Sequence, residues 1–104
     1  MLVLYVGYEI VVTVSVVNLA GAPVDIRGGT VRAEGRARAD ASADWVASAA
    51  IVDDASGKLT LTMTPTLAGS GTYEIWISGV EGISEGQPVK TGTYRVSRPI
   101  VVPA

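Results

Sequence analysis

The stretch GKLTLTMTP, residues 57–65, alternates apolar and polar side chains along its length. Leu59, Leu61 and Met63 share one parity, and the threonines between them share the other. Because successive side chains of a strand point to opposite faces, this pattern predicts a strand with one buried face and one face in water. Pro65 lacks a backbone donor, so the strand is predicted to end there.

Five further segments show the strand pattern. They are the ranges of about 8–17, 30–38, 45–52, 72–78 and 89–96, with a last short candidate at 100–102 between two prolines. Clusters of Gly, Pro, Asn and Asp separate them at intervals of about 8–12 residues, and no segment keeps a helical period. The chain therefore predicts an all-β fold, an antiparallel β-sandwich of about seven short strands, in one domain over residues 1–104.

The composition argues against several classes of function. The chain has no Cys and no His, so it has no disulfide framework, no thiolate zinc site and no Ser-His or Cys-His catalytic arrangement. Its net charge of −2 argues against nucleic acid as a partner, because phosphate neutralisation needs a basic surface. The acidic run DDASG at 53–57 lacks the ligand spacing of a calcium loop and predicts a hairpin turn. We therefore predict no enzymatic activity, no cofactor and no metal.

The N-terminal segment is apolar over about twenty residues and ends in small residues, as signal peptides do. However, it has no basic start, it carries Glu9 within the run, and it places Ile10, Val12 and Val14 on one parity with mostly polar residues on the other. This period-two pattern favours a strand over a signal peptide or a membrane span. We therefore expect synthesis in the cytoplasm and no membrane partner.

Arginines gather in one short part of the chain. Arg27, Arg32, Arg36 and Arg38 are half of the basic residues, and the last three share one face of the strand predicted over 30–38. Guanidinium groups bind carboxylates in a bidentate manner, so this face is a candidate docking surface for an acidic partner. The alternative is a solvated outer face whose charges protect an edge strand from unwanted pairing.

The two tryptophans differ in their predicted environment. Trp45 lies in an apolar run and is predicted to be part of the core. Trp76 shares its parity with Glu74 and Ser78, so it is predicted to point outward. An outward Trp is a candidate contact residue, because aromatic residues are enriched at the centres of interfaces; alternatively, a loop of the same chain covers it. The candidate partner-binding residues are therefore Arg32, Arg36, Arg38 and Trp76.

The order of features along the chain resembles that of a known group of proteins. These features are the strand opening GYE at 7–9, the turn AGAPVDI at 20–26, the strand GTVRA at 29–33, the hairpin DDASGKLTL at 53–61 and GTYEI at 71–75. Together, over roughly residues 7–98, they resemble the small immunoglobulin-like β-sandwich virion proteins of tailed bacteriophages, such as the N-terminal domain of baseplate upper proteins. The long Gly-rich connection at 79–87 and the short one at 67–71 depart from the family pattern.

This resemblance implies a non-enzymatic virion component. We expect a capsid decoration or cement protein that binds across neighbouring capsid subunits, with the major capsid protein or other virion proteins as partners. A tail or baseplate accessory protein is the alternative, and a carbohydrate-binding β-sandwich module is the second alternative. The expected location is the virion, assembled in the host cytoplasm.

Both ends of the chain are apolar. The segments MLVLYV at 1–6 and PIVVPA at 99–104 would be exposed on a lone monomer, and exposed apolar segments favour association. We therefore expect at least one end to be buried in an assembly, and the protein to be a homo-oligomer in the particle, with a trimer as one form.

Overall fold

The computed structural model describes residues 1–38, 40–83 and 86–98, and all of its regular elements are strands. They are β1 (Leu2–Tyr5), β2 (Ile10–Ser15), β3 (Thr30–Arg36), β4 (Trp45–Asp53), β5 (Lys58–Met63), β6 (Gly69–Ser78) and β7 (Lys90–Ser97). The predicted all-β fold with about seven strands is confirmed, and the described ranges contain no helix. The candidate strand at 100–102 lies outside the described residues.

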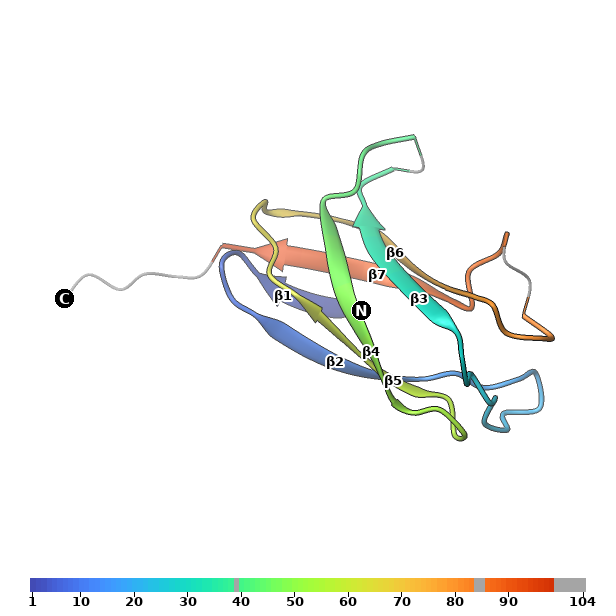
Figure 1. Cartoon of the computed structure of the whole chain (residues 1–104). Helices are drawn as coiled ribbons and strands as arrows, with labels where there is room; N and C mark the ends of the chain where they lie inside the picture. The colour runs from blue at the N-terminus through green and yellow to red at the C-terminus, as the bar shows by residue number, and fades with distance from the viewer. Residues whose placement is uncertain (39, 84–85, 99–104) are drawn as a thin grey trace.

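The strands form one mixed sheet in the order β1-β7-β6-β3-β4-β5-β2, which folds over at β4 (Figure 1). The first residues of β4, from Trp45 to Ala47, pair with β3, whereas the residues from Ser48 onward pair with β5. Inward side chains of β2 and β5 therefore meet those of β6 and β7 in a common core.

The prediction of a purely antiparallel arrangement is wrong at the N-terminus. The other neighbouring pairs run antiparallel, but β1 pairs with β7 in parallel, with Leu4 opposite Val96. The strands β1 and β2 lie at opposite edges of the sheet, and Gly7 adopts a positive φ of 81° in the connection between them. No strand was predicted before about residue 8, so β1 itself was missed. Its direction could not have been predicted from alternation either, because parallel and antiparallel strands share the same side-chain period.

The N-terminal apolar segment packs on its own chain. Leu4 is fully buried, whereas Val3 and Tyr5, on the opposite parity, remain about half exposed. Part of the N-terminal apolar segment thus forms β1 and packs against the core of the same molecule. The segment 99–104 lies outside the described residues, and burial of an end in an assembly remains a prediction.

The core contains the inward side chains that the alternation predicted. Leu59, Leu61 and Met63 of β5 are at most 2% exposed, and full burial of such a side chain contributes about 1.5–3 kcal/mol to folding. The other buried apolar side chains are Leu4, Val14, Val16, Ile26, Ala33, Trp45, Ile75, Ile77, Tyr94 and Val96. The prediction that Trp45 belongs to the core is therefore confirmed.

Three aromatic rings pack together where β4 begins. The Trp45 ring centroid lies 6.5 Å from that of Tyr73 and 5.4 Å from that of Tyr94, the second pair edge to face. Gly35 lies against the Trp45 ring, and a Cβ at this position would come within 2.4 Å of Cε2. Packing thus explains the glycine near the end of β3, because only a residue without a side chain leaves room for the ring.

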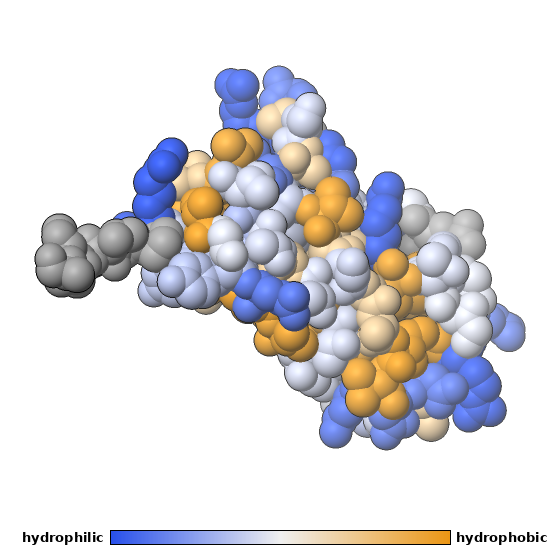
Figure 2. Space-filling view, turned by 60° about the vertical axis from the view of Figure 1, so that its left-hand side comes forward, coloured by the Kyte–Doolittle hydropathy of each residue, from blue (hydrophilic) through white to orange (hydrophobic). Residues whose placement is uncertain are grey.

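The exposed apolar side chains lie in several separate parts of the surface. Figure 2 shows apolar patches separated by polar and charged residues on one face of the molecule. Well-exposed apolar side chains include those of Val11, Leu19, Val46 and Val52. Within the described part of the chain, no helix is long and apolar enough to cross a membrane.

Candidate functional site

The ladder between β3 and β6 places Arg32 directly opposite Trp76 on the outer face of the sheet. The neighbours Ile75 and Ile77 are fully buried, so the alternation of β6 turns Trp76 outward, as the sequence predicted. The guanidinium carbon of Arg32 lies 4.3 Å from the centroid of the Trp76 ring. This is a cation–π contact, worth about 0.5–1 kcal/mol at an exposed site. The Trp76 ring is therefore covered in part by an arginine of the same sheet.

A shallow pocket of about 210 Å³ lies at this pair and is lined by Thr30, Arg32, Trp76 and Ser78. Thr30 and Ser78 are also cross-strand neighbours, so two hydroxyl groups lie beside the ring and the guanidinium. None of the ion pairs found among the described residues involves Arg32. Its N–H donors are therefore available to an external acceptor, and a carboxylate matches their geometry best.

Arg36 has a different role from Arg32. Its guanidinium donates to the carboxylate of Glu34 from Nε and Nη2, and to the backbone carbonyl of Ala41 from Nη1. Glu34 is only 8% exposed, and its cross-strand neighbour on β6 is a second carboxylate, Glu74. The hydrogen bond to Glu34 raises the pKa of Arg36 above its usual value. Arg36 thus neutralises a nearly buried carboxylate and ties the connection between β3 and β4 to the sheet.

The prediction that Arg38 belongs to the same strand face is wrong. The strand β3 ends at Arg36, and Arg38 lies in a turn that is closed by a hydrogen bond from the Ala41 amide to the Arg38 carbonyl. The Arg38 side chain is well exposed there, with Nε 3.8 Å from Oδ1 of Asp40. The three arginines therefore do not form one uniform cationic face, and Arg32 is the member that has no acidic neighbour within ion-pair distance among the described residues.

Arg36 and Arg38 still lie near each other, because both line a second hollow of about 160 Å³ together with Thr72 and Glu74. This hollow contains a carboxylate, and both of its arginines already have acidic neighbours. It is therefore less suited to an acidic ligand than the pocket at Arg32 and Trp76.

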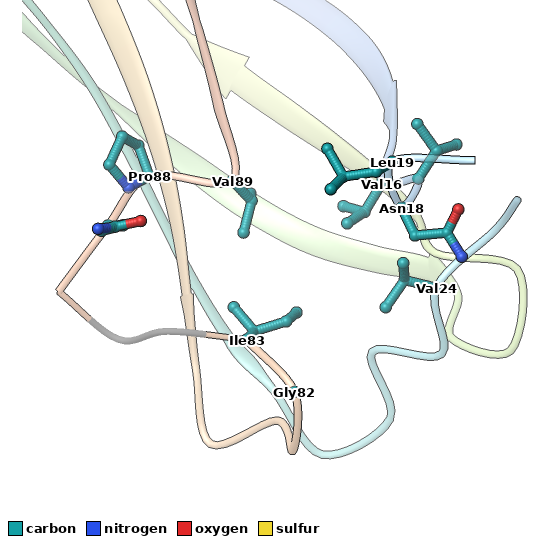
Figure 3. Close-up of a pocket in the computed structure, with 10 residues that line it drawn as sticks. Val16, Asn18, Leu19, Val24, Gly82, Ile83, Pro88 and Val89 are labelled. Carbon is teal, nitrogen blue, oxygen red and sulfur yellow. The ribbon is translucent and has the colours of Figure 1, made fainter. Parts of the chain in front are cut away.

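A larger pocket of about 390 Å³ lies where the connections β2–β3 and β6–β7 meet (Figure 3). Its lining residues are Val16, Val17, Asn18, Leu19, Val24, Gly82, Ile83, Gln87, Pro88 and Val89. Figure 3 shows Ile83 and Val89 on one side of the opening and Val24 on the other. The side-chain oxygen of Asn18 accepts hydrogen bonds from two amides of its own loop, so it is not directed at a ligand. Most of the lining residues are apolar in type. No sequence pattern predicted the pocket, because two distant connections build it.

The acidic pair lies where β4 ends and the turn to β5 begins, and Oδ1 of Asp53 accepts a hydrogen bond from the amide of Ser56. The carbonyl of Asp54 accepts hydrogen bonds from the amides of Ile26 and Gly57, and Gly57 has a positive φ of 71°. The predicted hairpin turn, with a glycine at the left-handed position, is confirmed. In the described ranges, no group of three or more His, Cys, Asp or Glu side chains could hold a metal ion.

No protein-family model and no curated protein matches the chain. Among solved structures, it is similar to the crystal structure of the Lin-41 filamin domain, with a TM-score of 0.55 over 93% of this chain and 84% of that chain. The sequence identity is 16%, so the similarity concerns the fold alone. It supports the immunoglobulin-like type of β-fold.

Proposed function

We propose that this chain is a non-enzymatic binding protein with an immunoglobulin-like β-sandwich fold, and that it contacts a protein partner through Arg32 and Trp76. The observation that carries the proposal is the cross-strand pair of the exposed Arg32 and the partly exposed Trp76, in which the guanidinium carbon lies 4.3 Å from the ring centroid. Arg and Trp are enriched among the residues that dominate interface energies. Stacking on the ring also holds the guanidinium in place before binding, which lowers the entropy lost on association.

The charges around the pair restrict the partner surface that fits it. Glu34 and Glu74 form the neighbouring pair on the same face of the ladder, and Arg36 neutralises only Glu34, so the charge of Glu74 repels an acidic group from that side. Thr30 and Ser78 form the neighbouring pair on the other side and offer hydroxyl donors. A partner carboxylate is therefore expected to approach from the side of Thr30 and Ser78, with an apolar group of the partner against Trp76.

The setting that we propose for this contact is a bacteriophage virion, in which the chain is a capsid decoration or cement protein on the major capsid protein. The sequence resemblance to small virion proteins supports this setting. Many copies on a symmetric shell would add weak individual contacts through multivalency. A tail or baseplate accessory protein is the alternative setting.

Co-sedimentation with separated heads and tails of the encoding phage tests the contact and the setting together. Trp76→Ala and Arg32→Met are each expected to weaken particle binding by about tenfold or more, while thermal unfolding shows that the domain remains folded. Arg38→Met is the matched control, because Arg38 lies beyond the end of β3 and away from the ring. Binding that survives both changes would contradict the proposed contact, and binding to neither heads nor tails would contradict the proposed setting.

Carbohydrate binding is a second candidate, because the pocket at Trp76 combines a ring with the hydroxyl groups of Thr30 and Ser78. Arg32 covers part of the ring on which a sugar would stack. Arg32→Met is therefore expected to increase glycan affinity, whereas the same change is expected to weaken a protein partner. A glycan array on both forms separates these outcomes, and no binding by either form would exclude the carbohydrate role.

A further inference from the structure

We infer that the open edge of β2 is a self-association surface, through which two copies of this chain join their sheets by antiparallel pairing of β2 with β2. In the sheet order β2 is a terminal strand, and β5 pairs with it along one side. No second strand of the described residues pairs along Ile10–Ser15. The unpaired backbone groups of such an edge are a template for another strand.

The ladder geometry identifies the backbone groups on the open side. The amide of Val16 donates to the carbonyl of Gly57, in the continuation of the pairing between β2 and β5. Bonded residues alternate along an antiparallel ladder, so Val11, Thr13 and Ser15 direct their N–H and C=O groups away from β5. The side chains of these three residues are exposed as well. Both the backbone and the side chains of this edge are therefore open to a partner strand.

The chain pairs with itself beyond the end of β2. Val17 forms a β-bridge with Pro23, and the amide of Val24 donates to the carbonyl of Val16. By the same alternation, the Val16 carbonyl lies on the side of β5, so the segment 23–24 continues that paired side. In the described part of the chain, the other side of the stretch from Val11 to Ser15 remains open.

The edge lacks the features that usually prevent pairing. Residues 10–17, IVVTVSVV, contain no charged residue, no Pro and no Gly. Natural edge strands are commonly protected by Lys, Pro or a bulge. The irregularity found between β4 and β5 lies in β4, between Ile51 and Asp53, so it does not distort β2. An uncharged, β-branched and regular edge favours pairing with another strand.

A second copy of the chain is the partner that fits this edge. Antiparallel pairing centred on Thr13 places Thr13 opposite its own copy and Val11 opposite Ser15, which uses the backbone groups of all three residues. Like charges do not meet, since the paired stretch has none. The charges closest to it are Glu9 and Lys58, and Lys58 pairs with Ser15 from β5. In this register Glu9 of one copy and Lys58 of the other share a face, with Cα atoms roughly 12 Å apart, so two extended side chains can meet.

Sedimentation equilibrium at concentrations up to the millimolar range tests this pairing. The wild-type chain is expected to form a dimer, and Thr13→Lys is expected to weaken it by at least about tenfold, because two like charges then face each other at the two-fold axis. Thr13→Glu is expected to have the same effect. An equal mixture of the two variants is expected to restore the dimer, since opposite charges then face each other. Thr93→Lys on the exposed face of β7 is the matched control and should leave association unchanged.

Amide hydrogen exchange gives an independent readout, because the amides of Val11, Thr13 and Ser15 should become protected as the concentration rises. Thermal unfolding of each variant shows whether a loss of association reflects a loss of the fold. A monomer at millimolar concentration, a closed trimer, or a dimer that both Thr13 variants leave intact would overturn the inference. The experiment uses this chain alone, so its outcome is independent of the contact proposed for Arg32 and Trp76.

Discussion

The phenolic oxygen of Tyr94 lies 2.8 Å from Oδ2 of Asp44, in a hydrogen bond that joins β7 to the residue before β4. The Tyr94 side chain is almost fully buried, and its ring packs edge to face on Trp45. Asp44 is also held through its backbone, because its amide donates to the carbonyl of Gly35 at 2.7 Å. The two bonds fix the start of β4 at the aromatic end of the core.

Tyr94→Phe is expected to lower the free energy of unfolding by about 1–2 kcal/mol, because the hydrogen bond is lost and the partly buried Asp44 loses a donor. The ring packing is retained, since Phe has the same shape. Urea denaturation measures the change. Tyr5→Phe is the control, because Tyr5 is about half exposed and its change should stay within about 0.5 kcal/mol. Equal effects of the two substitutions would show that the bond to Asp44 contributes nothing to stability.

The same bond predicts a loss of stability at high pH. Burial, followed by the hydrogen bond to Asp44, raises the pKa of Tyr94 well above its usual value of 10.0. The folded state then keeps the proton to higher pH than the unfolded state, so the contribution of Tyr94 is complete below pH 10.0 and is lost as the pH rises toward the folded-state pKa. The urea midpoint of the wild type should therefore fall more between about pH 8 and about pH 11 than that of Tyr94→Phe. Parallel falls in the two proteins would exclude Tyr94 as the source.

The sequence could predict which side chains of a strand are buried, because apolar residues alternate with polar ones and mark the face that packs on the core. Leu59, Leu61 and Met63 are inside and Trp76 is outside, as their parity indicated. Glu34 marks the limit of this reasoning. Its parity predicted a wet face, but it is only 8% exposed, because Arg36 and the connection after β3 cover it.

Pairings between strands could not be predicted in the same way. The contact of Arg32 with Trp76 depends on β3 and β6 being neighbours in a particular register, and the bond of Tyr94 to Asp44 joins residues fifty positions apart. Side-chain period carries no information on which strands lie side by side. The sequence therefore predicted the residues of the candidate site one by one. The fold shows that Trp76 contacts Arg32, and that Arg38 lies beyond the end of β3.

Gly35→Ala is expected to destabilise the domain by about 1–3 kcal/mol through overpacking. The new Cβ would lie 2.4 Å from Cε2 and 2.5 Å from Nε1 of Trp45, and the ring is held in place by Tyr73 and Tyr94. Urea denaturation would report the change in stability. Gly86→Ala is the control, because a Cβ there meets no atom within 4 Å and its backbone φ is not positive. If both variants are as stable as the wild type, the ring is not confined by Gly35.

Arg36→Gln is expected to lower the urea midpoint clearly, whereas Arg38→Gln is expected to leave it nearly unchanged. The first substitution removes the guanidinium from Glu34, a nearly buried carboxylate that faces Glu74 across the ladder. The second removes only an exposed contact of 3.8 Å with Asp40, and such surface pairs contribute little. The double variant Glu34→Gln with Arg36→Gln should recover part of the lost stability, because it removes the uncompensated charge together with its partner. The double variant could instead be less stable than Arg36→Gln alone. That result would show that neutralisation of the Glu34 carboxylate is not the main contribution of Arg36 to stability.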